Sequence, residues 1–488
     1  MFETDSVWGL VSDIKKKVKE ECVMARPRRE HGGEQPHIPA GIFKIRIPFY
    51  HWKWTWPEAV QGFILVAVAL AAVPFIQTGI GASVEVAVLM VFMFSVIYML
   101  HPTFGDPIFP GWITAGIPIT LAYLYPFAMG PQRIHALVSL QMLVAFMFIV
   151  LGATGIANKI VSLVPASLRG GVLFGAAIAA IFGIINPVAT SHFYGREISG
   201  TIGVVVCLIV LYGVWFVPLK NKNIFFSLIS KSGMLAGMII ALIIGVAIGE
   251  LPMPEVQWGI SPLPFGELFA NYTIFGVGFP PASYFIAAIP TAILLYLIAF
   301  GEIVVTEAMV TDVAPHRPDE IIGYSANRAN IIVGTRNLIL SLFAPYPPMA
   351  GPNWMGGTAS TIERYKTGRK NMDSLNDGIS SFIIAMAIAP LFLPLVTLLA
   401  PAFPIGMIIT MMVTGFAVGY VAMGMLKTRE DQGIAIIMGL TIFARGAAVG
   451  LVTGVALYFL LVGIKKTQAA MTEKKDAEEK EEEVEEVS

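Results

Sequence analysis

The chain has 488 residues, of which 56% are hydrophobic and 13% are charged, and its formal net charge is −1. Soluble domains average about 25% charged residues, and the mean hydropathy of this chain is +0.73. This composition excludes a soluble globular protein and indicates many membrane-spanning helices. The nearly balanced charge gives no reason to expect a nucleic-acid partner.

The two ends of the chain differ from its middle. Residues 1–55 are polar and basic, and residues 466–488 form a charged tail with few apolar residues to bury. We expect a cytoplasmic amino-terminal region, whose lysine cluster at 15–17 suits the inner membrane surface, and a disordered acidic carboxyl-terminal tail. Residues 56–465 are predicted to form one membrane transport domain. The two cysteines, Cys22 and Cys207, indicate neither a disulfide framework nor a metal site.

Apolar runs near the length of a membrane helix predict about fourteen spanning segments. The predicted fold is therefore an all-α polytopic membrane protein, with repeats of seven segments at about 56–250 and 284–465. The thirteenth segment is too short to cross a bilayer core alone. The segments are expected at 57–76, 82–100, 107–125, 134–156, 167–187, 199–217, 233–250, 284–308, 329–344, 352–364, 377–397, 403–425, 431–444 and 446–463.

The distribution of basic residues supports this count. If the amino terminus is cytoplasmic, most of the 32 Lys and Arg residues fall in inner loops and the termini. Arg133, Arg196 and Arg445 fall outside, and Arg336 falls within a span. Because the positive-inside rule predicts such a split, we expect both termini on the cytoplasmic side of the plasma (inner) membrane.

Two proline- and glycine-rich breaks, half a chain apart, interrupt the third and tenth segments. The first reads Pro-Ile-Phe-Pro-Gly-Trp-Ile-Thr-Ala-Gly over 107–116, and the second reads Pro-Tyr-Pro-Pro-Met-Ala-Gly-Pro-Asn-Trp-Met-Gly-Gly-Thr over 345–358. Matched breaks in the two halves of a membrane protein indicate a transport site between inverted repeats. A second match, Pro-Ala-x-x-x-Gly at 165–170 and 401–406, supports the repeat, with coincidence between loops as the alternative.

The breaks also predict the site. Backbone freed by proline or glycine inside a membrane must be satisfied by protein or water. We therefore expect a short extended stretch in each break, followed by a half-helix, with the two helix starts facing each other. Their free amides and positive dipole ends suit an anion or a carbonyl-rich ligand, and plain helix kinking is the alternative. The expected substrate contacts are Gly111, Trp112, Thr114, Gly351, Asn353 and Thr358.

Two ionisable residues lie inside predicted spans. Glu302 is in the eighth segment, where a carboxylate is costly unless it faces a cavity, has a partner or binds a proton. Thr306 lies one turn later on the same face, so Glu302 and Thr306 are both candidate substrate ligands. Arg336 lies mid-way in the ninth segment. Glu302 and Arg336 are candidate ion-coupling residues, and a purely structural pair between them is the alternative.

Several stretches resemble known permeases. Ile-Pro-Thr-Ala-Ile-Leu-Leu at 289–295, followed by Val-Val-Thr at 304–306, resembles the eighth helix of xanthine/uracil permeases. The stretch 160–168 is similar to the adenine/guanine permease branch, and 351–369 is similar to that branch and to the sulfate permease family. The resemblance implies a fourteen-helix inverted-repeat transporter with core and gate domains, which forms homodimers and moves substrate by an elevator-like shift of the core.

The chain departs from both branches of this superfamily. Nucleobase relatives carry an acidic ligand in helix eight, where Ile298 stands in one alignment and Glu302 follows one turn later. Their helix-ten acid falls near Gly356, so that ligand is missing. Sulfate permease relatives lack the helix-ten acid but usually carry a soluble carboxyl-terminal domain, which we do not expect here.

The sequence therefore predicts a secondary active transporter (a permease) of a small polar solute, either nucleobase-like or a small anion. We expect proton or sodium coupling and elevator-like alternating access. The alternative is an anion channel or exchanger of the sulfate permease type. An intramembrane enzyme is a distant alternative, because the spans show no catalytic or metal-binding motif. The expected partners are a small-molecule substrate, a coupling ion, the bilayer and a second copy of the chain, with no cofactor.

Overall fold

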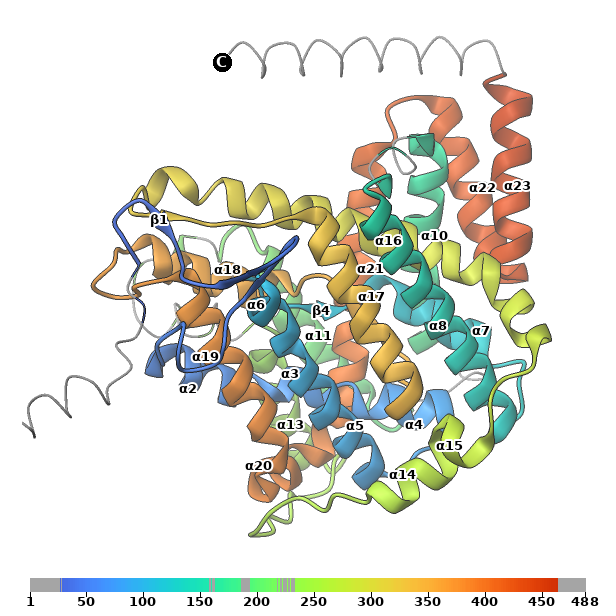
Figure 1. Ribbon diagram of the computed structural model, residues 1–488. Coiled ribbons are helices and arrows are strands. Elements are labelled where there is room, and N and C mark those ends of the chain that lie inside the picture. Colours follow the sequence, from blue (N-terminus) through green and yellow to red (C-terminus); the bar gives the residue numbers. More distant parts are fainter. Residues whose placement is uncertain are drawn as a thin grey trace, which may run out of the picture.

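The structure is a computed structural model that describes residues 27–463, apart from 28, 158, 160–162, 186–193, 217, 220–221, 223–225, 227–228 and 230–232. The lysine cluster at 15–17, Cys22 and the tail at 466–488 lie outside the described residues. Helices dominate the described part, which confirms the predicted all-α polytopic membrane fold (Figure 1).

The helices follow the chain in two halves. The first half contains α2 (Trp56–Ile64), α3 (Val66–Leu70), α4 (Val73–Ile80), α5 (Val84–Val96), α6 (Leu100–Phe104), α7 (Ile117–Leu124), α8 (Pro131–Thr154), α10 (Ala166–Ile185), α11 (Glu197–Tyr212) and α13 (Met234–Ala247). The second half contains α14 (Phe265–Tyr272), α15 (Ile274–Val277), α16 (Ala282–Thr311), α17 (Ala326–Phe343), α18 (Met355–Lys366), α19 (Leu375–Ile388), α20 (Leu393–Leu399), α21 (Phe403–Met425), α22 (Arg429–Arg445) and α23 (Ala447–Leu461).

Helices occupy every range in which the sequence predicts a span. Among the described residues, six helical stretches are long and apolar enough to cross a membrane: Trp56–Ile80, Val84–Phe104, Pro131–Thr154, Ala166–Ile184, Ala282–His316 and Leu393–Met425. Shorter apolar helices cover Thr114–Leu124, Glu197–Tyr212, Met234–Ala247, Leu375–Leu391 and Ala447–Leu461. Length and composition thus support a polytopic protein, and the count of fourteen spans stays a prediction.

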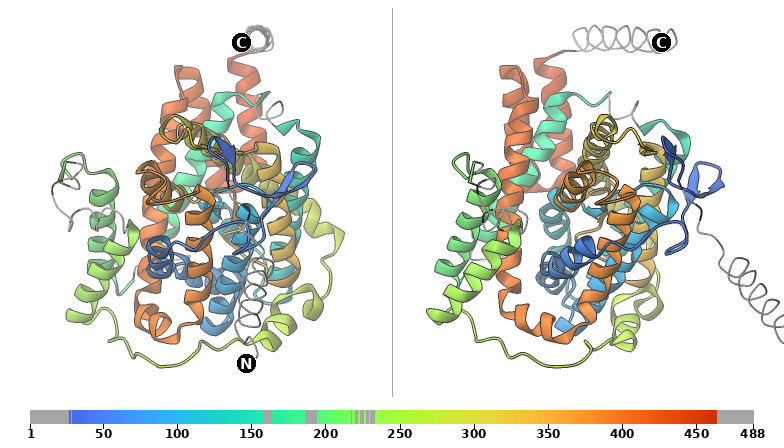
Figure 2. Two further views of the ribbon diagram at one scale, coloured as in Figure 1. Left: turned by 60° about the vertical axis from the view of Figure 1, so that its left-hand side comes forward. Right: turned by 90° about the vertical axis from the view of Figure 1, so that its left-hand side faces the viewer.

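The helices form two groups that lie side by side (Figure 2). In the first group, α10 packs against α21 and α22, α11 packs against α13 and α21, and α22 packs against α23. In the second group, α8 packs against α16 and α17, and α2 packs against α19. Each group draws helices from both halves of the chain. This is the division that a gate (the first group) and a core (the second group) require.

Three two-stranded sheets join segments that are mostly far apart in the sequence. β1 (Gly33–Glu34) pairs in parallel with β5 (Glu320–Ile321), and β2 (Ile38–Ala40) forms an antiparallel hairpin with β3 (Phe43–Ile45). β4 (Gly111–Trp112) and β6 (Ala350–Gly351) are antiparallel, and they lie in the first and second break. The extended stretches predicted in the two breaks are therefore confirmed, and they pair with each other.

The eleventh predicted segment, 377–397, is not one continuous helix as expected. A 3-10 turn separates α19 from α20, because Pro390 and Pro394 cannot donate helical hydrogen bonds. The connection between α13 and α16 contacts the chain at this gap. The Ser261 amide donates to the Leu391 carbonyl at 2.9 Å, and the Ser261 hydroxyl donates to the Pro390 carbonyl at 2.6 Å.

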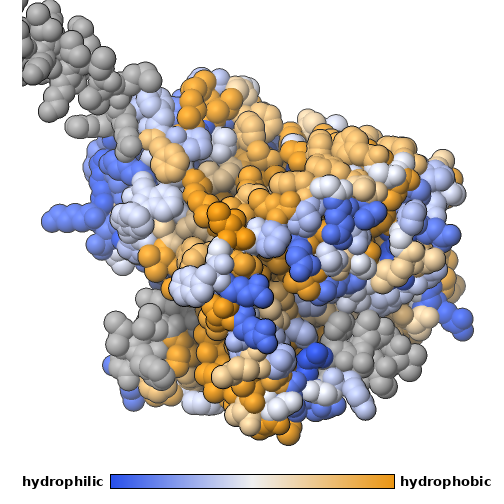
Figure 3. All heavy atoms as spheres, turned by 90° about the horizontal axis from the view of Figure 1, so that it is seen from below, coloured by the Kyte–Doolittle hydropathy of each residue, from blue (hydrophilic) through white to orange (hydrophobic). Residues whose placement is uncertain are grey.

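The connection between α13 and α16 crosses the lower end of the molecule (Figures 1 and 2). It contains α14 and α15, and its Met253, Trp258 and Ile260 side chains are largely exposed. Figure 3 views this end and shows hydrophobic and hydrophilic residues mixed over it. Exposed aromatic and apolar side chains beside polar ones are typical of a membrane–water interface.

Residues 29–53, here called the amino-terminal strap, lie against the loops at the opposite end of the core. Arg29 donates to Asp319 at 3.0 Å, and Lys53 donates to Asp373. Arg317 donates two hydrogen bonds to Asp319, at 2.6 and 3.0 Å. These bonds, first those from Arg317, hold the pKa of Asp319 well below its ordinary value. The strap thus ties the chain before the first span to loops of the second half.

Candidate functional site

The two breaks meet through the β4–β6 pair, in which Gly111 faces Gly351 and Trp112 faces Ala350. Both glycines are required by space. A Cβ on Gly351 would lie 2.3 Å from the Trp112 carbonyl oxygen, and a Cβ on Gly111 would lie 2.7 Å from the Asn353 carbonyl oxygen. Because the strands are antiparallel, α7 and α18 leave the pair in opposite directions and their amino termini face each other across it. This is the arrangement that the sequence predicts.

Thr358, in the first turn of α18, links the two breaks. Its hydroxyl accepts from the Phe109 amide at 3.1 Å and donates to the Asn353 side-chain oxygen at 2.7 Å. The Trp354 amide adds a bond to the Phe109 carbonyl at 2.7 Å. Thr358 is fully buried, so it positions Asn353 and the first break from behind the cavity.

Helix α17 holds the strand pair from its other side. Arg336 donates to the Gly351 carbonyl at 2.8 Å and to the Gly111 carbonyl at 3.4 Å. Asn337 accepts from the Ala350 amide at 2.9 Å and donates to the Ala350 carbonyl at 2.8 Å. Adjacent residues of one helix therefore satisfy backbone groups in both breaks, which an unpaired backbone inside a membrane requires.

A buried ion pair lies where the first break begins. Arg328, near the start of α17, donates to Asp106 at 2.8 Å and to the Gly105 carbonyl at 3.1 Å. Asp106 is fully buried. Arg328 is thus the ion-pair partner of Asp106 in the described part of the chain.

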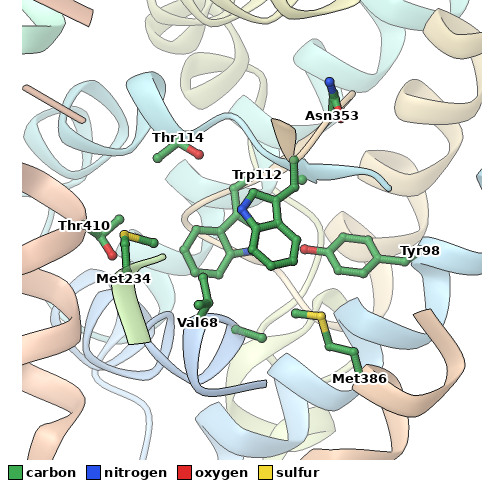
Figure 4. A pocket seen from close by; sticks show the side chains of 11 residues that line it. Val68, Tyr98, Trp112, Thr114, Met234, Asn353, Met386 and Thr410 are labelled. Atoms are coloured by element: carbon green, nitrogen blue, oxygen red, sulfur yellow. The ribbon is translucent and has the colours of Figure 1, made fainter. Parts of the chain in front are cut away.

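A cavity of about 50 Å³ lies beside the strand pair. Figure 4 shows Trp112 near its centre, with Tyr98 pointing toward it from one side and Met234 and Thr410 on the other. The Trp112 indole N–H is buried, and it lies beside the Tyr98 hydroxyl. The full lining is Val68, Ala69, Tyr98, Gly111, Trp112, Thr114, Met234, Asn353, Trp354, Met386 and Thr410.

The chemistry of this lining is one-sided. Indole, phenol, hydroxyl and amide groups supply N–H and O–H donors, and no Asp or Glu side chain is among the lining residues. The amino termini of α7 and α18 add backbone amides and the positive ends of their dipoles. The arrangement suits a ligand that accepts hydrogen bonds and carries negative charge.

Glu302 and Thr306 lie on α16, outside the lining of this cavity. One Glu302 carboxylate oxygen is buried and has no hydrogen-bond partner among the described residues. The Thr306 hydroxyl donates to the Glu302 backbone carbonyl at 2.6 Å. Arg336 is in none of the ion pairs of the described residues, so the alternative of a structural Glu302–Arg336 pair is wrong.

The predicted contacts thus fall into three sets. The cavity is lined by Gly111, Trp112, Thr114 and Asn353. Buried residues outside the lining hold the strands or the breaks together: Gly351, Thr358 and Arg336. Glu302 and Thr306 lie apart from both sets.

Several residues that line the cavity were not predicted from the sequence, and most of them lie outside the two breaks. Tyr98, Met234, Met386 and Thr410 come from apolar runs, in which the rotation of each helix decides which face meets the cavity. Trp354 was the one predictable from the sequence, because it lies in the second break next to Asn353. Among the described residues, no group of three or more His, Cys, Asp or Glu side chains is placed to hold a metal ion.

The fold and the paired breaks define a class of membrane protein in which two oppositely oriented halves supply broken helices to one central site. No protein-family model matches the chain, and no curated protein matches its sequence. Solved structures do match it at the level of the fold.

The chain is similar to murine Solute Carrier 26 family member A9 (Slc26a9), an anion transporter in the inward-facing state. The TM-score is 0.51 at 15% identity, over 86% of this chain and 69% of that chain. A second structure of SLC26A9 gives a TM-score of 0.50 at 17% identity, over 83% of this chain, which spans 65% of that one. The transmembrane domain of the cyanobacterium bicarbonate transporter BicA gives 0.48 at 15% identity, over 86% of this chain and 98% of that chain.

These likenesses bear on the family resemblance. Murine Slc26a9 is an anion transporter by name, and the xanthine/uracil permease assignment of this chain is not confirmed. At this level of identity the likeness shows the fold, so the activity of this chain has to be argued from its own site.

Proposed function

We propose that the chain is a secondary transporter of a small anion, which binds between α7 and α18. The observation that carries the proposal is the β4–β6 pair. It sets two helix amino termini beside a cavity that presents N–H and O–H donors and no carboxylate. Helix amino termini favour negative charge, and the Trp112 indole and the Tyr98 hydroxyl beside it offer further donors to the cavity.

The same cavity argues against a nucleobase. The acid of nucleobase relatives falls near Gly356, which lies in the first turn of α18, where an added Cβ would lie 3.4 Å from the Trp354 indole nitrogen. The volume of about 50 Å³ is far below the ~300 Å³ at which sites for drug-sized ligands begin. A small ion, alone or with about one water, fits a space of this size, since one water occupies about 30 Å³ in the liquid.

The structural neighbours support the same class of cargo. The match to Slc26a9, which is named as an anion transporter, extends over 86% of this chain. A shared fold alone does not transfer function, and here it agrees with a site built independently from donors and dipoles.

Alternating access is supported by the two helix groups. The cavity is lined by Met386 of the core group and by Tyr98, whose 3-10 turn packs against α19 of that group. Met234 and Thr410 line it from the gate group. A larger cleft of about 490 Å³ separates α7 and α16 from α10 and the α22–α23 turn. A shift of the core along the gate changes both spaces at once, as an elevator-like movement requires.

Coupling to protons or sodium is assigned to Glu302. Its carboxylate is partly buried inside a membrane helix and one oxygen has no protein partner among the described residues. Such a group needs a cation or a proton for compensation. Thr306 shares its face of α16, so it is the companion ligand that we propose.

We further propose an inner-membrane location with both termini cytoplasmic, and a homodimer. The distribution of Lys and Arg over the loops supports the orientation. The strap's contacts place residues 29–53 beside loops that carry Arg317 and Arg369, on the same side as the predicted inner loops.

Uptake into proteoliposomes tests the function. Labelled chloride, bicarbonate, sulfate, dicarboxylates, uracil and xanthine are supplied with and without a pH or sodium gradient. We expect saturable, gradient-stimulated accumulation of a small anion and none of the nucleobases. Accumulation of a nucleobase that anions do not inhibit would overturn the proposal, and anion flux that never exceeds equilibrium would indicate a channel.

A further inference from the structure

Arg336 is a buried positive charge with no carboxylate partner in the described part of the chain. It is fully buried, and no Asp or Glu oxygen of the described residues lies within 4.0 Å of its guanidinium nitrogens. Arg29, Arg317 and Arg328 are also buried, and each contacts an aspartate. Arg133 is buried without a carboxylate as well, and it donates to the Phe127 and Tyr125 carbonyls near the start of α8. A guanidinium stays protonated in proteins, so the charge of Arg336 needs compensation from elsewhere.

The neighbours of Arg336 supply only partial negative charge. Its guanidinium donates to the Gly351 carbonyl and lies 3.4 Å from His101 Nε2, which must be unprotonated to accept a hydrogen bond. The guanidinium carbon lies 5.5 Å from the ring centre of Phe94 and 5.0 Å from that of Tyr98. Carbonyl dipoles and aromatic faces attract a cation, but none of these groups carries a formal charge.

Two of these contacts face the cavity on their other side. Tyr98 lines it, and so does Gly111, whose carbonyl accepts from Arg336 at 3.4 Å. One residue, Tyr98 or Gly111, therefore separates Arg336 from the cavity. The charge of Arg336 acts on the cavity through buried protein, where charges interact more strongly than in water.

We propose that Arg336 is the fixed counter-charge of the anion site. It selects negatively charged cargo over neutral cargo of the same size without touching it, acting through Tyr98 and the Gly111–Gly351 pair. The proposal rests on the proposed function and deepens it. It gives Arg336 a part in choosing the charge of the cargo rather than in coupling to a proton or sodium ion.

The expected size of the effect follows from Coulomb's law. A unit charge roughly 9 Å from the anion at an effective dielectric constant of about 20 changes its affinity by about 20-fold. This is the loss expected when Arg336 becomes neutral while the site keeps its shape.

The test compares Arg336→Gln with Arg336→Lys. Both lose the guanidinium fork that reaches both strands, so both should lower the unfolding temperature of the purified full chain to a similar extent. Only the lysine keeps the charge. We expect half-saturation for the transported anion (chloride, bicarbonate or sulfate) to rise about 20-fold in Arg336→Gln and to stay within about threefold in Arg336→Lys. Equal half-saturation in the two variants would overturn the proposal.

A second pair of variants leaves Arg336 in place, in case Arg336→Gln does not fold. His101→Glu puts a carboxylate beside the guanidinium, and His101→Gln is the matched neutral control. We expect His101→Glu to weaken anion binding about tenfold or more relative to His101→Gln, because the new carboxylate neutralises Arg336. Equal anion affinity in these two variants would contradict a counter-charge role.

Failure of the inference is distinguishable from failure of the proposed function. If the wild-type chain takes up no anion, the proposed function fails. If the wild type takes up an anion and both pairs of variants show no dependence on charge, Arg336 is a structural clamp and only this inference fails.

Discussion

Replacing Gly351 by alanine tests whether the strand pair is the structural centre of the site. The added Cβ would lie 2.3 Å from the Trp112 carbonyl oxygen and 2.8 Å from the Ile113 nitrogen. Those atoms belong to the backbone, so the strands have to separate. Overpacking of this kind costs about 1–3 kcal/mol. Weakening the hydrogen bond from Arg336 to the Gly351 carbonyl, 2.8 Å long in the wild type, adds about 1.5–3 kcal/mol because its donor is charged.

The sum is roughly 2.5–6 kcal/mol, which lowers the folded-to-unfolded ratio by a factor of about seventy or more. Gly424→Ala is the matched control, because Gly424 lies inside α21 and an added Cβ there meets nothing within 4 Å. Thermal unfolding in detergent and anion uptake in proteoliposomes measure the two variants. We expect Gly351→Ala to lose stability and uptake, and Gly424→Ala to keep both. A Gly351→Ala protein as stable and active as Gly424→Ala would refute the reasoning.

Three further predictions concern residues around the site and the strap. Glu302→Gln removes the carboxylate at nearly constant size, so uptake driven by a pH or sodium gradient should fall to the gradient-free rate; full stimulation by the gradient would exclude Glu302 from coupling. Thr358→Val leaves the Phe109 amide and the Asn353 side chain without their partner, and should cost about 1–3 kcal/mol of unfolding free energy. Thr358→Ser keeps the hydroxyl and should cost less than about 1.5 kcal/mol, so equal unfolding midpoints for these two variants would contradict the proposed link. Because the folded-state pKa of Asp319 lies below its ordinary value of 3.8, the stability it contributes is complete above that pH and is lost as the pH falls below it. Asp319→Asn should therefore lower the unfolding midpoint at neutral pH and reduce the acid-side loss, and a variant that follows the wild-type midpoint at every pH from neutral to acid would contradict this.

The two breaks were predictable because their physical cause is local. Proline removes an amide donor and glycine permits close approach, so 107–116 and 345–358 cannot continue as helices. The long apolar runs and the distribution of Lys and Arg predict the polytopic fold in the same direct way. The pairing of the two breaks with each other follows from the repeat, which the matched motifs also indicate.

The remaining parts of the site depend on tertiary contacts that no local pattern encodes. Arg336 contacts both strands because α17 packs behind them. The sequence indicates only that a charged residue lies inside a span, and it does not identify its partners. Tyr98 faces the cavity because of the orientation of the 3-10 turn at Ile97–Met99, between α5 and α6. The strap joins Arg29 to Asp319, 290 residues later, which no spacing argument reaches.

The break within segment eleven is a different kind of miss. Pro390 and Pro394 are visible in the sequence, and a proline in a helix interior breaks the helix because it lacks an amide donor. The apolar run continues through them, so the hydropathy pattern favours one span. In the structure, Ser261 in the connection between α13 and α16 donates hydrogen bonds to the Pro390 and Leu391 carbonyls, which have no helical donor at this break.

The central claim is that a small anion binds between the amino termini of α7 and α18. Diffraction from crystals of the full chain containing a heavy analogue of the transported anion (bromide for chloride, or selenate for sulfate), recorded at the absorption edge of bromine or selenium, tests it most directly. The account predicts an anomalous peak in the cavity between Trp112 and Asn353, which disappears when the lighter anion is added in excess. An ordered, competable anion elsewhere in the membrane domain, with this cavity empty, would contradict the account.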